Sequence, residues 1–199
     1  MSSMKKNLMI SVWMTIATTI LLGVIYPLVI TGLAQVLFKD KADGQLIAQN
    51  GKVAGSRILG QAFLGPAYFH SRPSAAGNGY DAANSSASNL GPTNQHLIDR
   101  VKSDVASNQA DHPQQAVPVD LVTSSGSGLD PHISPAAAEF QIGRVAKERG
   151  IETDDLRQLV LKHTEGRQWG FLGEARVNVL ELNLELDARF PLRKQAEVR

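Results

Sequence analysis

The chain has 199 residues, with 20 basic and 19 acidic side chains and a formal net charge of +1. This length suffices for one compact domain with a hydrophobic core besides any anchoring segment. A nearly neutral chain has no broad electrostatic surface for nucleic acid, and the absence of cysteine excludes disulfides, thiolate metal ligands and cysteine nucleophiles.

The first predicted element is an uncharged run within Asn7 to Phe38. A bilayer core about 30 Å thick needs roughly 20 apolar residues in a helix, so residues 8–38 are predicted to form a transmembrane helix. Lys5 and Lys6 precede the run, whereas basic and acidic side chains balance just after it. The positive-inside tendency therefore predicts that residues 1–7 are cytoplasmic and that the rest of the chain is periplasmic or extracellular. The alternative is a cleaved secretory signal, but such a signal needs an apolar part of only about 7–15 residues.

One face of this helix carries small side chains at intervals of four residues: Ser11, Thr15, Thr19 and Gly23. Small side chains let helices approach closely in lipid, so this face is predicted to pack against a helix of a partner subunit. The alternative is that the hydroxyl groups only bond the backbone of their own helix. Tyr26-Pro27 predicts a bend toward the outer end of the helix.

A β-hairpin is predicted to begin the external domain. The segments QLIAQ and KVAGSRILG flank Asn50-Gly51, a pair suited to the positive φ angles of a type I′ turn. The aromatic run Phe63–Phe69 is predicted to be partly strand and to supply core side chains. Residues 71–94 are rich in Ser, Asn, Gly and Pro. Such a segment is either a linker or an ordered functional loop, and anchors such as Arg72 and Tyr80 favour the ordered loop.

The next predicted elements are a helix and a strand. Apolar side chains at helical spacing predict a helix from Pro92 or Thr93 to Ser107. The β-branched segment Val117–Thr123 is predicted to be a buried strand.

Three further helices are predicted toward the C-terminus. Ser134 and Gly150 supply the start and stop signals of the first, and Thr153 begins the second, with acidic side chains in its first turn. Residues 178–189 alternate Leu with Glu and Asn as a strand would, yet they begin with the spacing of a capping box, and a helix is slightly favoured.

Together these elements predict a fold class and a domain organisation. The fold is an α/β (mixed α+β) soluble domain over residues 39–190, preceded by one N-terminal transmembrane helix. Residues 191–199 are a C-terminal tail.

The loop from Ser124 to Gly128 has the most chemical interest, because loops between a strand and a helix often offer backbone amides to a ligand. A phosphate-binding P-loop would need Lys where Leu129 stands, and no nucleophile elbow is present. Asp130 and His132 lack further histidines at metal-ligand spacing, so no metal site is predicted. The remaining alternatives are a hydrolase using Ser127 with Asp130 and His132, or ordinary turn and capping chemistry.

Five strings carry a resemblance to a known family: GSRILGQAF, YFHSRPSA, YDAANSSASNLGPTN, VPVDLVTSSGSGLDPHISPAAAEFQIGRVA and FLGEARVNVLELNLELD. They resemble the KdpC family, the C subunit of the bacterial high-affinity potassium-transporting ATPase. The resemblance implies a complex in the bacterial inner membrane with a channel-like potassium-translocating subunit, a P-type ATPase subunit and a small single-helix subunit. It also implies that this chain has no catalytic residues and that potassium is handled by the complex.

The same resemblance implies a second role, as a catalytic chaperone that raises the ATP affinity of the pump subunit. ATP would then be the cofactor, and its binding residues would be Ser125, Gly126, Ser127, Gly128, Gln141 and Arg144. The predicted topology disagrees, because the nucleotide domain of the pump is cytoplasmic whereas Lys5 and Lys6 place Gln141 outside. The favoured prediction is therefore a noncatalytic accessory subunit that is needed for assembly and stability of the channel-like and pump subunits, with its external domain near the potassium entrance.

Overall fold

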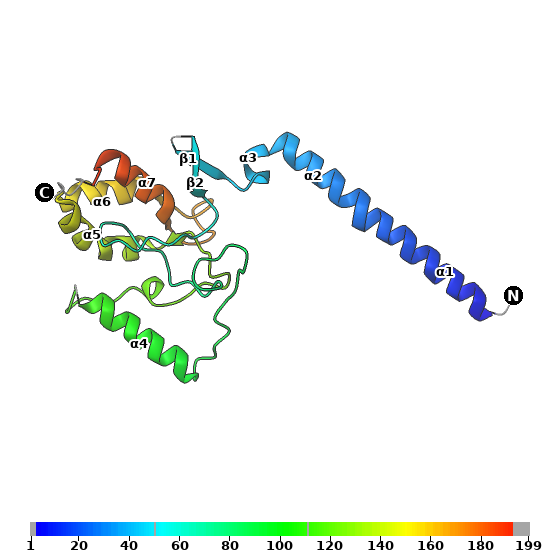
Figure 1. Ribbon diagram of the computed structural model, residues 1–199, viewed down its shortest axis with the longest axis horizontal. Helices are drawn as coiled ribbons and strands as arrows, with labels where there is room; N and C mark the ends of the chain where they lie inside the picture. The colour runs from blue at the N-terminus through cyan, green and yellow to red at the C-terminus, as the bar shows by residue number, and fades with distance from the viewer. Residues whose placement is uncertain (1–2, 50, 111, 193–199) are drawn as a thin grey trace, which may run out of the picture. The chain divides into compact units, whose positions relative to one another are not determined.

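The computed structural model describes residues 3–49, 51–110 and 112–192. The chain divides into two compact units, with the boundary between Leu46 and Ile47. The first unit is helical, and the second mixes helices and strands (Figure 1).

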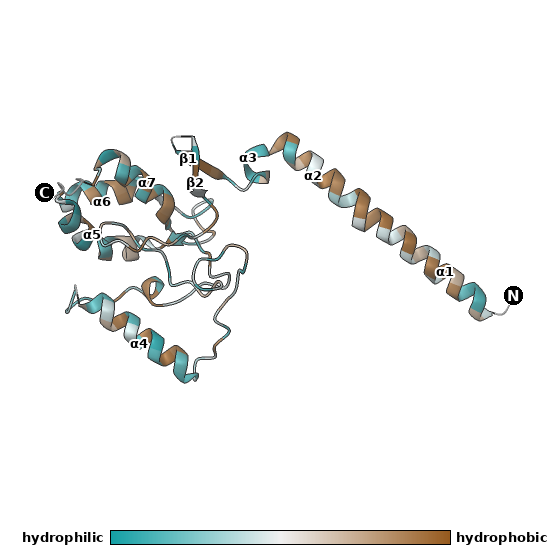
Figure 2. Cartoon of the chain, viewed as in Figure 1, coloured by the Kyte–Doolittle hydropathy of each residue, from teal (hydrophilic) through white to brown (hydrophobic). Residues whose placement is uncertain are grey.

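The first unit contains one long apolar helix. Its elements are α1 (Ser3–Thr18), a π-helical segment (Thr19–Ile25), α2 (Tyr26–Leu37) and the short α3 (Lys39–Ala42). Within the part of the chain that the structure describes, Ser3–Leu37 is the one helix long and apolar enough to cross a membrane. Figure 2, coloured by residue hydropathy, shows that hydrophobic residues dominate this helix.

The π-helical segment lies just before Pro27, where the sequence predicts a bend. Proline has no N–H group to donate to the preceding turn of an α-helix. The neighbouring amide of Tyr26 donates to the carbonyl of Leu21, five residues earlier, which is the hydrogen bond of a π-helix. The disturbance expected at Tyr26-Pro27 is therefore a widened turn that precedes the proline.

The second unit has the predicted mixed α and β class. Its helices are α4 (Gln95–Gln109), α5 (Pro135–Arg149), α6 (Thr153–Lys162) and α7 (Val179–Arg189). Its strands are β1 (Leu46–Gln49), β2 (Lys52–Ser56), β3 (His132–Ile133), β4 (Thr164–Glu165) and β5 (Arg176–Asn178). Strands β1 and β2 pair as the predicted hairpin, and β3-β5-β4 form an antiparallel sheet. Asn50 of the predicted turn lies outside the described residues.

The helix boundaries follow the local capping signals. The Ser134 hydroxyl accepts a hydrogen bond from the amide of Ala137 at the start of α5, and Gly150 ends that helix with a left-handed φ of 65°. Asn178 caps α7 in the same way by accepting from the amide of Glu181 at 3.1 Å. The helix predicted for residues 178–189 is therefore confirmed.

Both strand predictions in the middle of the chain are wrong. Residues 117–123 contain a short 3₁₀ turn, Val119–Leu121. The carboxylate of Asp120 accepts from the amide of Ser134 at 2.8 Å, and the Thr123 hydroxyl donates to the carbonyl of Val119 at 2.7 Å. These side-chain bonds favour a turn over a strand.

Residues 63–69, all of which the structure describes, contain no strand either. The buried amide side chain of Asn183 in α7 accepts from the N–H of Phe69 at 2.9 Å and donates to its carbonyl at 2.8 Å. Gln141 in α5 makes the same pair of bonds with the N–H and carbonyl of His70, at 2.8 and 3.2 Å. Helix side chains thus take the backbone bonds that a neighbouring strand would have supplied.

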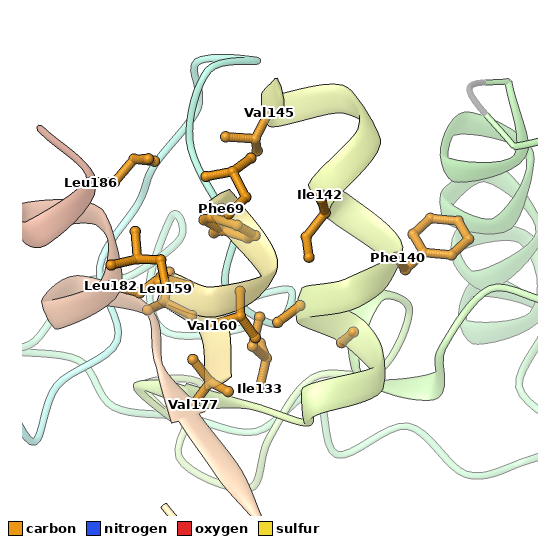
Figure 3. Close-up of a cluster of buried hydrophobic side chains, with 14 of the residues drawn as sticks. Phe69, Ile133, Phe140, Ile142, Val145, Leu159, Val160, Val177, Leu182 and Leu186 are labelled. Atoms are coloured by element: carbon orange, nitrogen blue, oxygen red, sulfur yellow. The ribbon is translucent and has the colours of Figure 1, made fainter. Parts of the chain in front are cut away.

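The hydrophobic core lies between α5, α6, α7 and the three-stranded sheet (Figure 3). Phe69 is fully buried at its centre, as predicted. The other large core side chains that Figure 3 labels are Ile133, Phe140, Ile142, Val145, Leu159, Val160, Val177, Leu182 and Leu186.

Candidate functional site

The candidate site is the loop of residues 123–134, which leads from the 3₁₀ turn into α5. A second segment crosses it at contact distance, because the amide of Gly60 donates to the carbonyl of Leu129 at 2.7 Å. A Cβ atom at Gly60 would lie 2.6 Å from the carbonyl oxygen of Asp130. The crossing therefore requires glycine at position 60 and fixes the far end of the loop.

The small-residue part of this loop is bonded to residues 74–86. The Ser74 hydroxyl donates to the carbonyl of Gly128 at 2.6 Å, and the amide of Ser86 donates to the carbonyl of Ser127 at 3.0 Å. Gly128 has a φ of +69°, and a Cβ there would lie 2.6 Å from the Ser86 carbonyl. The ordered loop predicted for residues 71–94 is therefore present, and it holds the glycine-serine loop in place.

Arg72 joins the two ends of the candidate loop. Its guanidinium donates to the carbonyl and the hydroxyl of Thr123, both at 3.3 Å, and pairs with the Asp130 carboxylate at 3.2 Å. The Tyr80 hydroxyl in turn donates to the Arg72 carbonyl at 2.6 Å. Burial alone would raise the pKa of Asp130, but hydrogen bonds from His132 and the charge of Arg72 outweigh it and hold the pKa below its usual value. Asp130 is therefore an ionised partner for Arg72 at neutral pH.

A polar cleft of about 310 Å³ opens beside this ion pair. Its charged lining residues are Arg72, Arg176, Asp120, Asp130 and Glu174, and His132 lies beside them. Both signs of charge are present, and the acidic groups are engaged by Arg72, by the amide of Ser134 and by Arg167. Among the described residues, no three His, Asp or Glu side chains gather as metal ligands. The chemistry of the cleft suits small polar groups or water.

The six residues considered for nucleotide binding fall into two groups. Ser125, Gly126, Ser127 and Gly128 belong to the loop bonded to residues 74–86, whereas Gln141 and Arg144 lie on α5 and contact residues 66–70. Contacts occur within each group: the Gly128 amide donates to the Ser125 carbonyl at 3.3 Å in the loop, and an Arg144 N–H donates to the Gln141 side-chain carbonyl at 2.8 Å on α5.

Gln141 is almost fully buried, and both ends of its amide are in use. Its oxygen accepts from the His70 amide and from Arg144, while its NH₂ donates to the carbonyls of His70 and Ala137. Burial, together with the charge of Arg144, lowers the pKa of the His70 ring, which keeps this histidine neutral. The role of Gln141 in this fold is to hold the backbone of a neighbouring segment.

The hydrolase alternative lacks its central contact. The Ser127 hydroxyl accepts from the amide of Leu129 at 3.1 Å and lies 3.4 Å from the Ser125 hydroxyl. The ring of His132 lies 3.5 Å from the Asp130 carboxylate. Serine and histidine therefore have different partners, and a nucleophile needs its base within hydrogen-bond reach.

The small-residue face of the N-terminal helix is exposed in the described chain. The Ser11 hydroxyl donates to the carbonyl of Asn7 at 2.8 Å, and the Thr15 hydroxyl donates to the carbonyl of Ser11 at 2.9 Å. These hydroxyl groups therefore bond their own helix, as the alternative reading expects. Because they need no outside partner, the face of Ser11, Thr15, Thr19 and Gly23 remains suitable for close packing against a second helix.

Two important side chains escaped sequence reasoning. Asn183 is fully buried among the leucines of α7, and Arg149 of α5 has a side chain that is only 1% exposed. Arg149 donates to the carbonyl of Ala67 and pairs with Asp187, both at 2.7 Å. For Asn183, the sequence offered one signal of a buried polar contact, namely its position on an apolar helix face between Leu182 and Leu186.

An N-terminal helix of membrane-spanning length followed by a small mixed α and β unit suggests a membrane protein. The chain belongs to the KdpC family, described as K⁺-transporting ATPase, c chain, whose family model matches residues 8–188. It is 67% identical over 189 residues to the potassium-transporting ATPase KdpC subunit of Koribacter versatilis, covering 95% of this chain and 98% of that protein. It is 58% identical to the subunit of the same name from Rhodospirillum rubrum, covering 88% of this chain and 92% of that protein.

Membership in this family identifies the chain as a subunit of a potassium-transporting ATPase. The resemblance inferred from the five sequence strings is therefore confirmed.

Proposed function

We propose that this chain is a noncatalytic accessory subunit, anchored by residues 8–38, whose domain lies outside the cytoplasm near the potassium entrance of the ATPase. The observation that carries the proposal is the charge asymmetry of the one membrane-length helix. Lys5 and Lys6 lie near its start, before its uncharged run, whereas Lys39 pairs with Asp43 at 3.0 Å just after it. Basic residues favour the cytoplasmic side, so the domain that follows belongs on the other side.

The membrane helix also supplies the contact through which this chain would support assembly of the complex. The face of Ser11, Thr15, Thr19 and Gly23 would pack against a helix of the channel-like subunit, with the pump subunit and the small single-helix subunit completing the complex. A helix that supplies an assembly contact stabilises its partners as well as itself.

The location is tested with single cysteines, because the chain contains none of its own. Ser103 is exposed on α4, so Ser103→Cys should react with a membrane-impermeant thiol reagent applied to intact cells with a permeabilised outer envelope. The matched variant Ser2→Cys should react only after the inner membrane is lysed. Labelling of the second variant but not the first in intact cells would overturn the proposed orientation.

The accessory role is tested by removing the chain. Without it, the remaining subunits should co-purify poorly, and cells should lose growth at low external potassium. Restoring the full chain should recover both properties. A complex that assembles and transports normally without this chain would refute the role.

The alternative function is the catalytic chaperone that contacts ATP through Gln141 and the Ser125–Gly128 loop. Presenting Gln141 to a nucleotide would break its bonds to His70 and Ala137, leaving buried backbone groups without partners. This cost, together with the charge asymmetry of the anchor, is why we prefer the external accessory role.

A further inference from the structure

A short hairpin between β4 and β5 is the most prominent apolar feature of the second unit that its core does not use. Gln168 and Leu172 exchange two backbone hydrogen bonds of 2.9 Å. Two ion pairs, Arg167 with Glu174 at 2.7 Å and Arg176 with Glu165 at 2.9 Å, connect its two sides. These cross-links give the hairpin a defined shape.

The tip of this hairpin presents large apolar side chains to solvent. Trp169 is 85% exposed, Phe171 is 69% exposed and Leu172 is 42% exposed. We call these three residues the hairpin tip. At such exposures the two aromatic side chains alone offer on the order of 300 Å² of apolar surface. Contiguous exposed patches of this size often mark binding sites in soluble domains.

The backbone at Trp169 is unfavourable for a bulky residue. Trp169 and Gly170 have successive φ angles of +52° and +82°, and the amide of Phe171 donates to the carbonyl of Gln168 at 3.3 Å. Two successive positive φ angles are typical of a type I′ turn, whose first central position favours Asn or Gly. A tryptophan in this position costs stability in the isolated chain. The chain thus keeps an exposed indole at a position where a smaller polar residue would fit better.

The charges around the hairpin tip favour a protein partner over lipid headgroups. The two flanking arginines, Arg167 and Arg176, are both paired with glutamates of the same hairpin. Interfacial segments that bind anionic lipid depend on uncompensated Lys and Arg beside their apolar residues. An apolar tip whose neighbouring charges are neutralised resembles the centre of a protein interface, where Trp is enriched and charged residues are depleted.

The area of the hairpin tip favours a partner that is already tethered nearby. A stable interface between two freely diffusing proteins buries about 800 Å² on each side, well above what the tip offers. Two copies of this chain joined only through their tips would therefore dissociate. Proteins held in one membrane complex meet at high effective concentration, so a smaller contact suffices.

We propose that the hairpin tip of Trp169, Phe171 and Leu172 docks into an apolar pocket on the external surface of another subunit of the same ATPase. This inference rests on the proposed function, because it requires the domain and the exposed parts of its partners to share one side of the membrane. Insertion of Trp169 gives the assembly a second contact, separate from the one made by the membrane helix.

The partner is identified by photo-crosslinking in the assembled complex. A photoreactive benzoylphenylalanine in place of Trp169 should yield, on irradiation of native membranes, an adduct between this chain and one other subunit. The same residue in place of Leu64, which is 88% exposed elsewhere on the unit, is the matched control and should not yield that adduct. An adduct only with lipid, an adduct only with a second copy of this chain, or no adduct would overturn the proposal.

A substitution separates docking from folding. Trp169→Asn suits the type I′ turn, so the chain should unfold at the same temperature as the wild type or at a higher one. The variant should nevertheless leave the detergent-solubilised complex about tenfold faster, since a buried Trp anchor dominates an interface of this size. Leu64→Ser should leave the dissociation rate unchanged. Unchanged dissociation of Trp169→Asn, or equal acceleration by Leu64→Ser, would refute the proposed docking surface.

The failure of this inference and the failure of the proposed function give different results. If the domain were cytoplasmic, Ser103→Cys would remain unlabelled in intact cells whatever the crosslinking result. If only the docking inference failed, Ser103→Cys would be labelled and no adduct with another subunit would form at position 169.

Discussion

Replacing Asn183 by Leu should strongly destabilise the domain. The side chain of Asn183 is fully buried, and it satisfies both the N–H and the carbonyl of Phe69, which is itself fully buried. Leucine has a similar volume but has no donor or acceptor. The substitution therefore leaves two backbone groups in the core without hydrogen-bond partners.

The expected size of the effect follows from these two groups. Each unpaired buried donor or acceptor costs about 1–3 kcal/mol, and the added apolar burial of leucine offsets about 1–2 kcal/mol. We therefore expect Asn183→Leu to lower the free energy of unfolding by about 2–3 kcal/mol, the middle of the range that these two terms span. For a chain of this length, the loss corresponds to a drop on the order of 10 °C in Tm.

Thermal unfolding of the full chain in detergent, followed by far-UV circular dichroism, measures this change. Asn108→Leu is the matched control, because Asn108 is half-buried on α4 and donates one hydrogen bond to the carbonyl of Asp104 within its own helix. The control should unfold within about 0.5 kcal/mol of the wild type. If Asn183→Leu were as stable as Asn108→Leu, the backbone contacts of Asn183 would not support the fold.

Three further predictions concern other parts of the domain. Gln141→Leu should lower the free energy of unfolding by about 2–3 kcal/mol, because it removes the hydrogen bonds to the N–H and carbonyl of His70. A variant with wild-type stability but weaker ATP-dependent transport would instead support the chaperone alternative. Gly60→Ala should cost about 1–3 kcal/mol in urea unfolding, because its Cβ would meet a backbone carbonyl at 2.6 Å, whereas Gly91→Ala, with open space around it, should change little. Hydrogen bonds from Lys162 and His163, together with the charges of His163 and Arg189, lower the pKa of Glu185 from 4.5 to about 2. The ionised Glu185 therefore contributes about 1 kcal/mol to the free energy of unfolding after solvent screening, and this contribution is complete above pH 4.5 and lost as the pH falls toward 2. Glu185→Gln should remove this part of the acid sensitivity of Tm.

Helices with local end signals could be predicted from the sequence. Ser134, Gly150 and Asn178 act on amides or turns within a few residues of themselves, and the structure shows each of them as a cap. The β1-β2 hairpin is equally local, since its strands are adjacent in the chain. The long apolar helix could also be predicted, because a single uninterrupted apolar run is a strong local signal.

The two strand predictions fail because the backbone partners there are distant side chains. Aromatic and β-branched residues at 63–69 and 117–123 have strand propensity, but propensity does not say whether a neighbouring strand exists. In the fold, Asn183 and Gln141 bond the first segment, and Asp120 and Thr123 hold the second in a turn.

The candidate site is predictable only in part for a similar reason. The glycine-serine loop and the helix that follows it are visible in the sequence, since they depend on local turn and cap chemistry. The position of Arg72 between Thr123 and Asp130 depends on a contact between segments more than 50 residues apart. Spacing along the chain therefore gives no sign that Ser125–Gly128 and Gln141 contact different segments.

The contact between Phe69 and Asn183 also has a consequence for biosynthesis. The two residues are 114 positions apart, and at 5–20 residues per second the ribosome needs on the order of ten seconds to make the chain between them. Throughout that interval, the segment around Phe69 exists without the helix that satisfies its backbone. The domain can complete its core only after α7 is synthesised, so folding of this domain is largely confined to the time after its last helix has been made.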